Sequence, residues 1–258
     1  MSSFRQVDFS KLVRFNSLAA SKLYSRYETF AKAKVIKKYA EPKSQVFVPS
    51  GMRCKRKSWF RLRGVPCDTL ENPDMQLEFT AEVGTACHQV LQENLSEMLG
   101  ADWLSVSDYL SLHPIPYKYT LQANGYETKV SIESPPMHFA CDGIMRLDNV
   151  IYLLEIKTCD HKVFEDLTDV KQIHKDQANA YATMLQIPRV LFIYESRLTG
   201  ERKIFEYTVP ESIQQTVLDS MTEIQYYAEN NLAPEKLITA YSDYMCRNCE
   251  YQKRCKEW

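Results

Sequence analysis

The pattern of apolar and polar positions predicts a long helix early in the chain and a second helix near its middle. Over residues 9–40, apolar side chains recur at steps of three and four among lysines and arginines, as in a basic amphipathic helix. Residues 80–99 repeat this spacing, and His88 sits beside their apolar stripe, so His88 can point inward. The stripe consists of Val83, Cys87, Val90, Leu91, Leu95 and Met98.

Strand patterns follow and alternate with helical ones. The predicted strands cover residues 129–134, 138–148, 150–159, 189–196 and 203–209. A turn-like segment at Asp148 and Asn149 predicts that the second and third of these strands pair as an antiparallel hairpin. Helical patterns occupy residues 176–187 and 210–230. Strands interleaved with helices indicate an α/β fold.

Composition limits the class of protein. The chain has 258 residues, of which 45% are apolar, enough to bury a substantial core. No apolar run approaches the roughly 20 residues needed to cross a bilayer, and the first residues lack the apolar stretch of a secretion signal. We therefore expect no membrane partner and a cytoplasmic location, or the host cytoplasm if the protein is viral.

Charge is distributed unevenly along the chain. Residues 1–63 hold 16 Lys and Arg against 3 Asp and Glu, a net charge of +13. The other 195 residues hold 16 Lys and Arg against 30 Asp and Glu, a net charge of -14. A basic segment joined to an acidic one suits a polyanionic partner held beside metal-binding carboxylates, although a solvated basic helix would give the same balance.

Two carboxylates and a lysine form the first candidate site. Glu155 and Lys157 are two residues apart on a predicted strand, so they share a face, and Asp142 on the neighbouring strand can reach that face. Such a set suits Mg²⁺ or Mn²⁺, and the bound ion acidifies a water and neutralises a scissile phosphate. An incidental ion pair on a surface hairpin is the alternative. Against it, Glu155 interrupts an apolar run, where an unpaired carboxylate is costly to bury.

These residues resemble the motifs of the PD-(D/E)xK nucleases, and others narrow the resemblance to the RecB-like branch. Gly84 and His88 match its G-x-x-x-H motif, Asp142 its core-strand Asp, Glu155 and Lys157 its E-x-K motif, and Gln177 and Tyr181 its Q-x-x-x-Y motif. The resemblance implies a restriction-endonuclease-like core, a mixed sheet flanked by helices. It implies catalytic roles for Asp142, Glu155, Lys157, Gln177 and Tyr181, and metal ligands at His88, Asp142, Glu155 and Ile156.

Three of the eight cysteines lie close together near the C-terminus. Cys246, Cys249 and Cys255 can occupy three corners of a metal or cluster site, which then needs a fourth ligand. Cys54 is the candidate for that ligand, and Cys67 is its main rival. We expect the four cysteines outside this set to be small residues of the core or near the site. They are Cys67, Cys87, Cys141 and Cys159.

One cysteine before the core and three after it resemble the iron–sulfur RecB-like nucleases, which include CRISPR-associated nucleases, a eukaryotic replication helicase–nuclease and the bacterial AddB subunit. The resemblance implies that a [4Fe–4S] cluster on these cysteines joins the N- and C-terminal segments. Zinc is the alternative, because sulfur ligands also suit it. The chain then divides into a basic segment (1–79), a nuclease core (80–232) and a cluster-binding tail (233–258).

A basic segment with aromatic residues surrounds Cys54. It combines charges that neutralise phosphates with rings on which bases can stack. The candidate DNA-binding residues are Arg53, Lys55, Arg56, Lys57, Trp59, Arg61 and Arg63. Alternatively, Trp59 and Phe60 anchor the core.

The resemblance implies a metal-dependent deoxyribonuclease, an exonuclease acting on single-stranded ends or flaps in replication, recombination or repair, including that of a virus or phage. One alternative is a CRISPR adaptation factor that trims spacer precursors. Another is a non-catalytic DNA-binding scaffold held by iron–sulfur or zinc. The sequence contains no Walker motif, so any helicase activity would belong to a partner.

Overall fold

The chain forms two compact units. The computed structural model describes residues 17–68, 71, 73–236, 242–247 and 249–257. Residues 1–41 and 69–78 make up one unit, the helical unit, and residues 42–68 and 79–258 make up the other, the core unit. Among the described residues, no helix combines the length and the apolar character that a membrane span requires.

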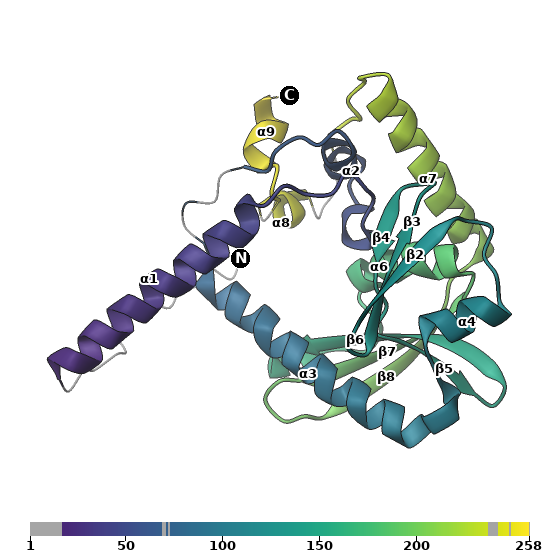
Figure 1. The fold of residues 1–258 in the computed structure, drawn as a ribbon, viewed down its shortest axis with the longest axis horizontal. Coiled ribbons are helices and arrows are strands. Elements are labelled where there is room, and N and C mark those ends of the chain that lie inside the picture. Colours follow the sequence, from purple (N-terminus) through teal and green to yellow (C-terminus); the bar gives the residue numbers. More distant parts are fainter. Residues whose placement is uncertain (1–16, 69–70, 72, 237–241, 248, 258) are drawn as a thin grey trace. The chain divides into compact units, whose positions relative to one another are not determined.

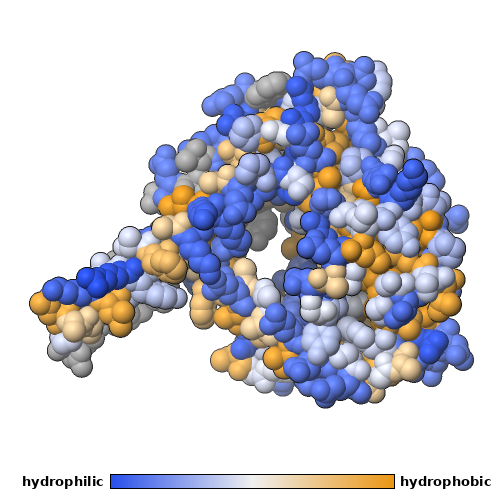
Figure 2. All heavy atoms as spheres, in the orientation of Figure 1, coloured by the Kyte–Doolittle hydropathy of each residue, from blue (hydrophilic) through white to orange (hydrophobic). Residues whose placement is uncertain are grey.

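Helix α1 (Leu18–Ala40) is the main element of the helical unit. Ser17 caps it by accepting a hydrogen bond from the N–H of Ala20 at 3.1 Å. The predicted helix over residues 9–40 is confirmed from Leu18 onward, whereas residues 9–16 lie outside the described part. Several large apolar side chains of α1 are exposed, so hydrophobic and hydrophilic residues lie side by side on its surface (Figure 2). They are Leu18, Leu23, Tyr27 and Phe30.

Glu78 holds the end of α1 within the helical unit. Its carboxylate accepts hydrogen bonds from the ammonium of Lys38 at 2.9 Å and from the hydroxyl of Tyr39 at 2.7 Å. The bond from Lys38, followed by that from Tyr39, lowers the pKa of Glu78. Glu78 therefore stays ionised near neutral pH and keeps its ion pair with Lys38.

A mixed five-stranded sheet forms the centre of the core unit. Its order is β1-β5-β6-β7-β8, with β6 and β7 parallel and all other neighbours antiparallel. The strands are β1 (Trp103–Leu104), β5 (Gly143–Leu147), β6 (Val150–Cys159), β7 (Arg189–Ser196) and β8 (Arg202–Thr208). Parallel neighbours need a crossover, which α5 (His161–Glu165) and α6 (Gln172–Leu185) supply. The predicted α/β class, a mixed sheet flanked by helices, is confirmed (Figure 1).

Alternation along β6 separates the two faces of this sheet. Leu154 and Ile156 pack with Leu91 of α3 (Met75–Leu99), whose core-unit part lies across the sheet in Figure 1. Leu153 points to the opposite face and belongs to the larger core, together with Tyr181 of α6. Helix α3 therefore covers one face and α6 the other, and Glu155 shares the face of Leu153.

The inward face of α3 differs in part from the predicted stripe. Leu91 and Gln92 are buried and His88 is half-buried, which confirms that His88 points inward. Val90 and Met98 are exposed, so the prediction was wrong for them. Val83, Cys87, Leu91 and Leu95 are buried or half-buried, as predicted. The inward side also includes the polar Gln92, which apolar spacing alone did not place there.

The predicted hairpin joins β5 to β6. Its turn residues Asp148 and Asn149 have φ angles of 49° and 64°, a left-handed conformation that Asp and Asn adopt more readily than most residues. The prediction of one strand over residues 138–148 was wrong. The chain leaves one sheet after Phe139 and enters another at Gly143, and Asp142 lies in this crossing.

A second, antiparallel sheet precedes the crossing. Its order is β2-β3-β4, formed by β2 (Tyr119–Asn124), β3 (Glu127–Ile132) and β4 (Met137–Phe139). The elements that the sequence did not predict include β1, β2, η3 (Gly100–Asp102) and α4 (Val106–Leu112). With two residues in β1 and seven in α4, neither is long enough to show a periodic pattern.

The core unit also contains α7 (Glu211–Glu229) and several short helices. They are η2 (Pro49–Gly51), α2 (Lys55–Leu62), α8 (Ser242–Arg247) and α9 (Gln252–Glu257). Trp59 of α2 is 0% exposed and donates from its indole N–H to the carbonyl of Tyr227 at 3.3 Å, while Phe60 stacks on Tyr251. Trp59 is therefore a core anchor, and the prediction that it stacks on DNA bases was wrong.

Gly143 leaves no room for a side chain at the start of β5. A Cβ atom there would lie 2.5 Å from Cη2 of Trp103. Gly143→Ala should therefore lower the free energy of unfolding, measured by urea denaturation, by about 1–3 kcal/mol, as overpacking usually does. In a Trp103→Leu background the same change should cost much less. An equal cost in both backgrounds would exclude the indole ring as the cause.

Candidate active site

The candidate site forms where β5 stops pairing with β6. The last pair is Gly143 with Leu154, so the following part of this β6 edge has no strand partner among the described residues. The N–H of Ile156 instead donates to Oδ2 of Asp142 at 2.5 Å. In an extended strand the N–H and C=O of one residue point to the same edge, so the carbonyl of Ile156 also faces Asp142.

Helix α3 holds Asp142 from the other side. Gln92 donates to the main-chain carbonyl of Asp142 at 2.6 Å, and Nδ1 of His88 lies 3.4 Å from its Oδ1. His88 and Gln92 are four residues apart and so share one helix face. A Cβ at Gly84 would lie 3.2 Å from Oγ1 of Thr158, so glycine there lets α3 approach β6. Sequence reasoning missed Gln92, although its spacing from His88 was a usable signal.

Glu127 completes a group that can hold a metal ion. Ligand atoms of His88, Glu127 and Asp142 all lie within 4.8 Å of one another, and within the described ranges no other three His, Cys, Asp or Glu side chains do so. Burial raises the pKa of Glu127, and the charge of Asp142 raises it further. A cation between these carboxylates would offset their repulsion. Glu127 begins β3 of the other sheet and matches no motif, so no sequence pattern indicated it.

The protonation of His88 is linked to this group. Burial disfavours the charged imidazole, but the hydrogen bond and charge of Asp142 outweigh burial and raise the pKa of His88 above its usual value. A metal ligand must be the neutral imidazole, so a proton and a metal ion compete for His88. Metal affinity should therefore fall as the pH is lowered through the pKa of His88.

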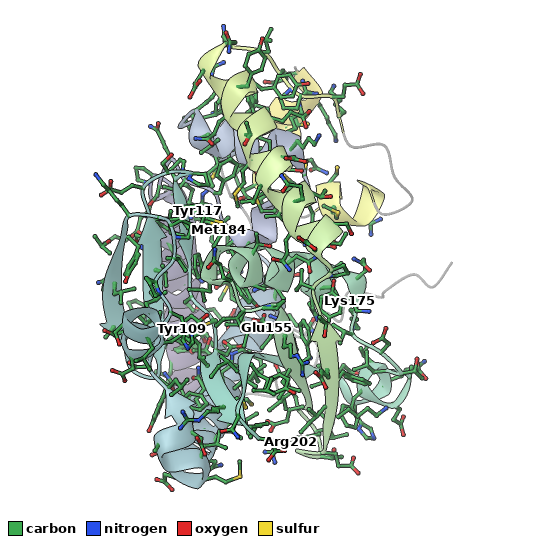
Figure 3. The ribbon with its side chains drawn as sticks, turned by 90° about the vertical axis from the view of Figure 1, so that its right-hand side faces the viewer. Tyr109, Tyr117, Glu155, Lys175, Met184 and Arg202 are labelled. Atoms are coloured by element: carbon green, nitrogen blue, oxygen red, sulfur yellow. The ribbon has the colours of Figure 1, made fainter. Side chains whose placement is uncertain are left out.

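The other predicted catalytic residues form a second hydrogen-bonded group. Glu155 is 2% exposed and lies inside the core unit (Figure 3). Its carboxylate accepts hydrogen bonds from the ammonium of Lys157 and from the hydroxyl of Tyr181. Lys157 also donates to Oε1 of Gln177 at 3.3 Å. Burial raises the pKa of Glu155, Lys157 opposes this effect, and the net shift is upward.

The two groups adjoin through the backbone of β6. Asp142 is bonded to the N–H of Ile156, the residue between Glu155 and Lys157. Their charges interact, because Asp142 raises the pKa of Glu155, and both Lys157 and Glu155 act on His88. Glu155 does not belong to the three-residue metal group, and its two oxygens instead contact Lys157 and Tyr181.

Four cysteines line one cavity of about 210 Å³ in the core unit. They are Cys54, Cys246, Cys249 and Cys255. Cys67 is not among the lining residues. Within the described residues, no three of the four sulfurs lie within 4.8 Å of one another.

Most charges of the predicted DNA-binding segment have partners inside the protein. Lys55 pairs with Glu223 of α7, Lys57 pairs with Glu250 at 2.7 Å, and Arg63 donates to Asn231. Arg56 is 5% exposed, so the prediction that it presents a free charge to DNA was wrong. The ion pairs of Lys55 and Lys57 thus attach α2 to α7 and to the C-terminal tail.

Comparisons with known proteins give distant similarities only. No protein-family model and no curated protein matches the sequence. The structure resembles the crystal structure of SSO0001, with a TM-score of 0.47 and 12% identity, over 89% of this chain and 96% of that chain. It also resembles an alkaline exonuclease (LHK-Exo) from Laribacter hongkongensis, with a TM-score of 0.46 and 11% identity, over 86% and 100% of the two chains. At such scores a shared function does not follow from the similarity.

Replacing Glu127 tests its place in the metal group. Glu127→Gln should weaken Mn²⁺ binding, followed by electron paramagnetic resonance of the free ion, about 10- to 100-fold, the usual loss when a metal site is deprived of a supporting group. Glu133→Gln removes an exposed carboxylate just after the same strand and should leave the affinity unchanged. Equal Mn²⁺ affinity in both variants would exclude Glu127 from the site.

Proposed function

We propose that this protein is a metal-dependent nuclease of the PD-(D/E)xK class that hydrolyses phosphodiester bonds of DNA. One observation carries the proposal: Asp142 of the His88–Glu127–Asp142 group is bonded to Ile156, the residue between the paired Glu155 and Lys157. Carboxylates, an imidazole and a lysine at one place are the parts that phosphodiester hydrolysis needs.

The donor set suits Mg²⁺ or Mn²⁺, because it combines carboxylate oxygens with one imidazole and one carbonyl. His88, Glu127 and Asp142 would hold the ion. The motif resemblance adds Glu155 and the carbonyl of Ile156 as ligands, and Ile156 adjoins this group through its bond to Asp142. When bound, such an ion acidifies a water and neutralises charge on the scissile phosphate.

The remaining side chains position these groups. Glu155 and Gln177 hold the ammonium of Lys157, which can then orient the attacking water or stabilise the negative charge that develops on the phosphate. Tyr181 fixes the second oxygen of Glu155 from the buried side. These hydrogen bonds keep the lysine and the carboxylate in place before substrate binds.

We further propose that the substrate is single-stranded DNA, cleaved from an end. The support is the resemblance of the four sequence motifs to RecB-like nucleases, together with the net charge of +13 over residues 1–63. A positive segment is expected beside a polyanion.

A [4Fe–4S] cluster on Cys54, Cys246, Cys249 and Cys255 is the second part of the proposal. The four side chains line one cavity, which Cys67 does not. The cluster would tie the chain before α2 to the tail and stabilise the fold by closing a long loop.

Glu155→Gln and Lys157→Met should each slow Mn²⁺-dependent cleavage of end-labelled single-stranded DNA at least about 100-fold, because each removes a group that acts on the reacting phosphate. DNA binding should persist in both variants. Glu165→Gln and Lys162→Met replace exposed residues of α5 and should retain activity. Cleavage that survives both active-site changes would contradict the assignment.

Cys249→Ser should lose most of the roughly four irons per chain that a cubane cluster supplies, and should melt at a lower temperature. Iron analysis and a visible spectrum after anaerobic purification measure this loss. Cys67→Ser, the matched control, should keep the iron. Unchanged iron in the Cys249 variant would refute the ligand set. Zinc instead of iron in the unmodified protein would show that these cysteines form a zinc site.

A further inference from the structure

A cavity of about 640 Å³ lies against the first turn of α6, apart from the cysteine-lined one. Arg53 and Lys171 both line it, although they are far apart in the sequence. Gln172 and Ile173, the first two residues of α6, also face it. The cavity thus brings two cationic side chains to the N-terminal end of a helix.

Within the described part of the chain, neither cation has an acidic partner. Nε and Nη1 of Arg53 are buried and form no hydrogen bond within the described structure, an arrangement that costs free energy unless an acceptor binds there. Lys171 forms no ion pair with any described residue. Asp176 also lines the cavity, and its carboxylate accepts a hydrogen bond from the side chain of Gln172 at 2.7 Å. The two cations of the lining therefore outnumber its one acidic side chain.

The first turn of α6 adds to this positive character. Lys171 is its N-cap residue, and no side chain caps the helix. The N–H groups of Gln172 and Ile173 have no acceptor within the helix, because they belong to its first turn. Such N–H groups and the helix dipole favour an anion at this end.

The charges near the cavity and Lys157 of the candidate site both act on His174. Burial, together with the charges of Lys157, Lys171 and Arg53, lowers the pKa of His174 to about 3. His174 is therefore neutral near neutral pH, and its Nδ1 lies 2.6 Å from the hydroxyl of Tyr194. The catalytic lysine and the two cavity cations all act on this one imidazole.

The remainder of the wall is largely apolar and includes Met52, Ile213 and Val217. We propose that the cavity binds one nucleotide of a single-stranded DNA substrate, with a phosphate other than the scissile one against Arg53, Lys171 and the first turn of α6. The base of that nucleotide packs on the apolar wall, which requires it to be unstacked and so favours a single strand. This inference rests on the proposed function and adds a place for the substrate beside the reacting group.

Binding of a fluorescent oligothymidylate, measured by anisotropy in EDTA, tests the site without metal or hydrolysis. Arg53→Gln and Lys171→Gln should each weaken binding and reduce the slope of log K against log salt concentration by about 0.7, the value for one phosphate contact to a single strand. Lys118→Gln removes an exposed lysine that does not line the cavity and should keep the slope. Thermal melting identifies a variant that fails to fold, and the half-buried Lys171 provides a second variant if Arg53→Gln is unstable.

Unchanged slopes in folded Arg53→Gln and Lys171→Gln would overturn the phosphate site. Thymidine monophosphate should displace the oligonucleotide more effectively than inorganic phosphate does, and equal displacement would overturn the placement of the base. A protein that binds with the expected slopes but does not cut DNA in Mn²⁺ would refute the nuclease proposal and support this site. If the protein cuts DNA but the Arg53 and Lys171 variants leave the slope unchanged, the nuclease proposal is supported and this phosphate site is refuted.

Discussion

The hydrogen bond from the N–H of Ile156 to Asp142 is the interaction on which the candidate site depends. β5 ends before this point, so β6 would otherwise present a buried, unpaired N–H, which costs about 1–3 kcal/mol. A side-chain acceptor at the crossing between the two sheets satisfies it. The same carboxylate then faces His88 on α3 and Glu127 on β3, so one local requirement of the sheet assembles groups from three elements.

Burial of Glu155 imposes the second requirement. A carboxylate inside an apolar sheet needs partners, and Lys157 and Tyr181 supply a counter-charge and a hydrogen bond. Gln177, one turn before Tyr181 on α6, holds the lysine in turn. The contacts that make the buried charge tolerable therefore also fix the geometry of the groups proposed to act on the phosphate.

The positive charge of the first part of the chain has two roles in the core unit. Lys55 and Lys57 form ion pairs with α7 and the tail, so they stabilise the fold around the cysteine-lined cavity. Arg53 instead turns two unbonded nitrogens inward, and Lys171 joins it from α6. Composition alone does not distinguish these cations. In the structure, Lys55 and Lys57 have acidic partners, whereas two nitrogens of Arg53 form no hydrogen bond to a described residue.

The sequence by itself determined the features that depend on local spacing. Helical periodicity placed α6 and the inward position of His88, and the two-residue repeat put Glu155 and Lys157 on one face of β6. The tertiary structure alone decided which distant residues meet. It split residues 138–148 between two sheets, brought Glu127 to Asp142 and buried Trp59. It also placed Cys54 beside the tail cysteines. These contacts join segments far apart in the chain, and no local pattern of apolar and polar residues encodes them.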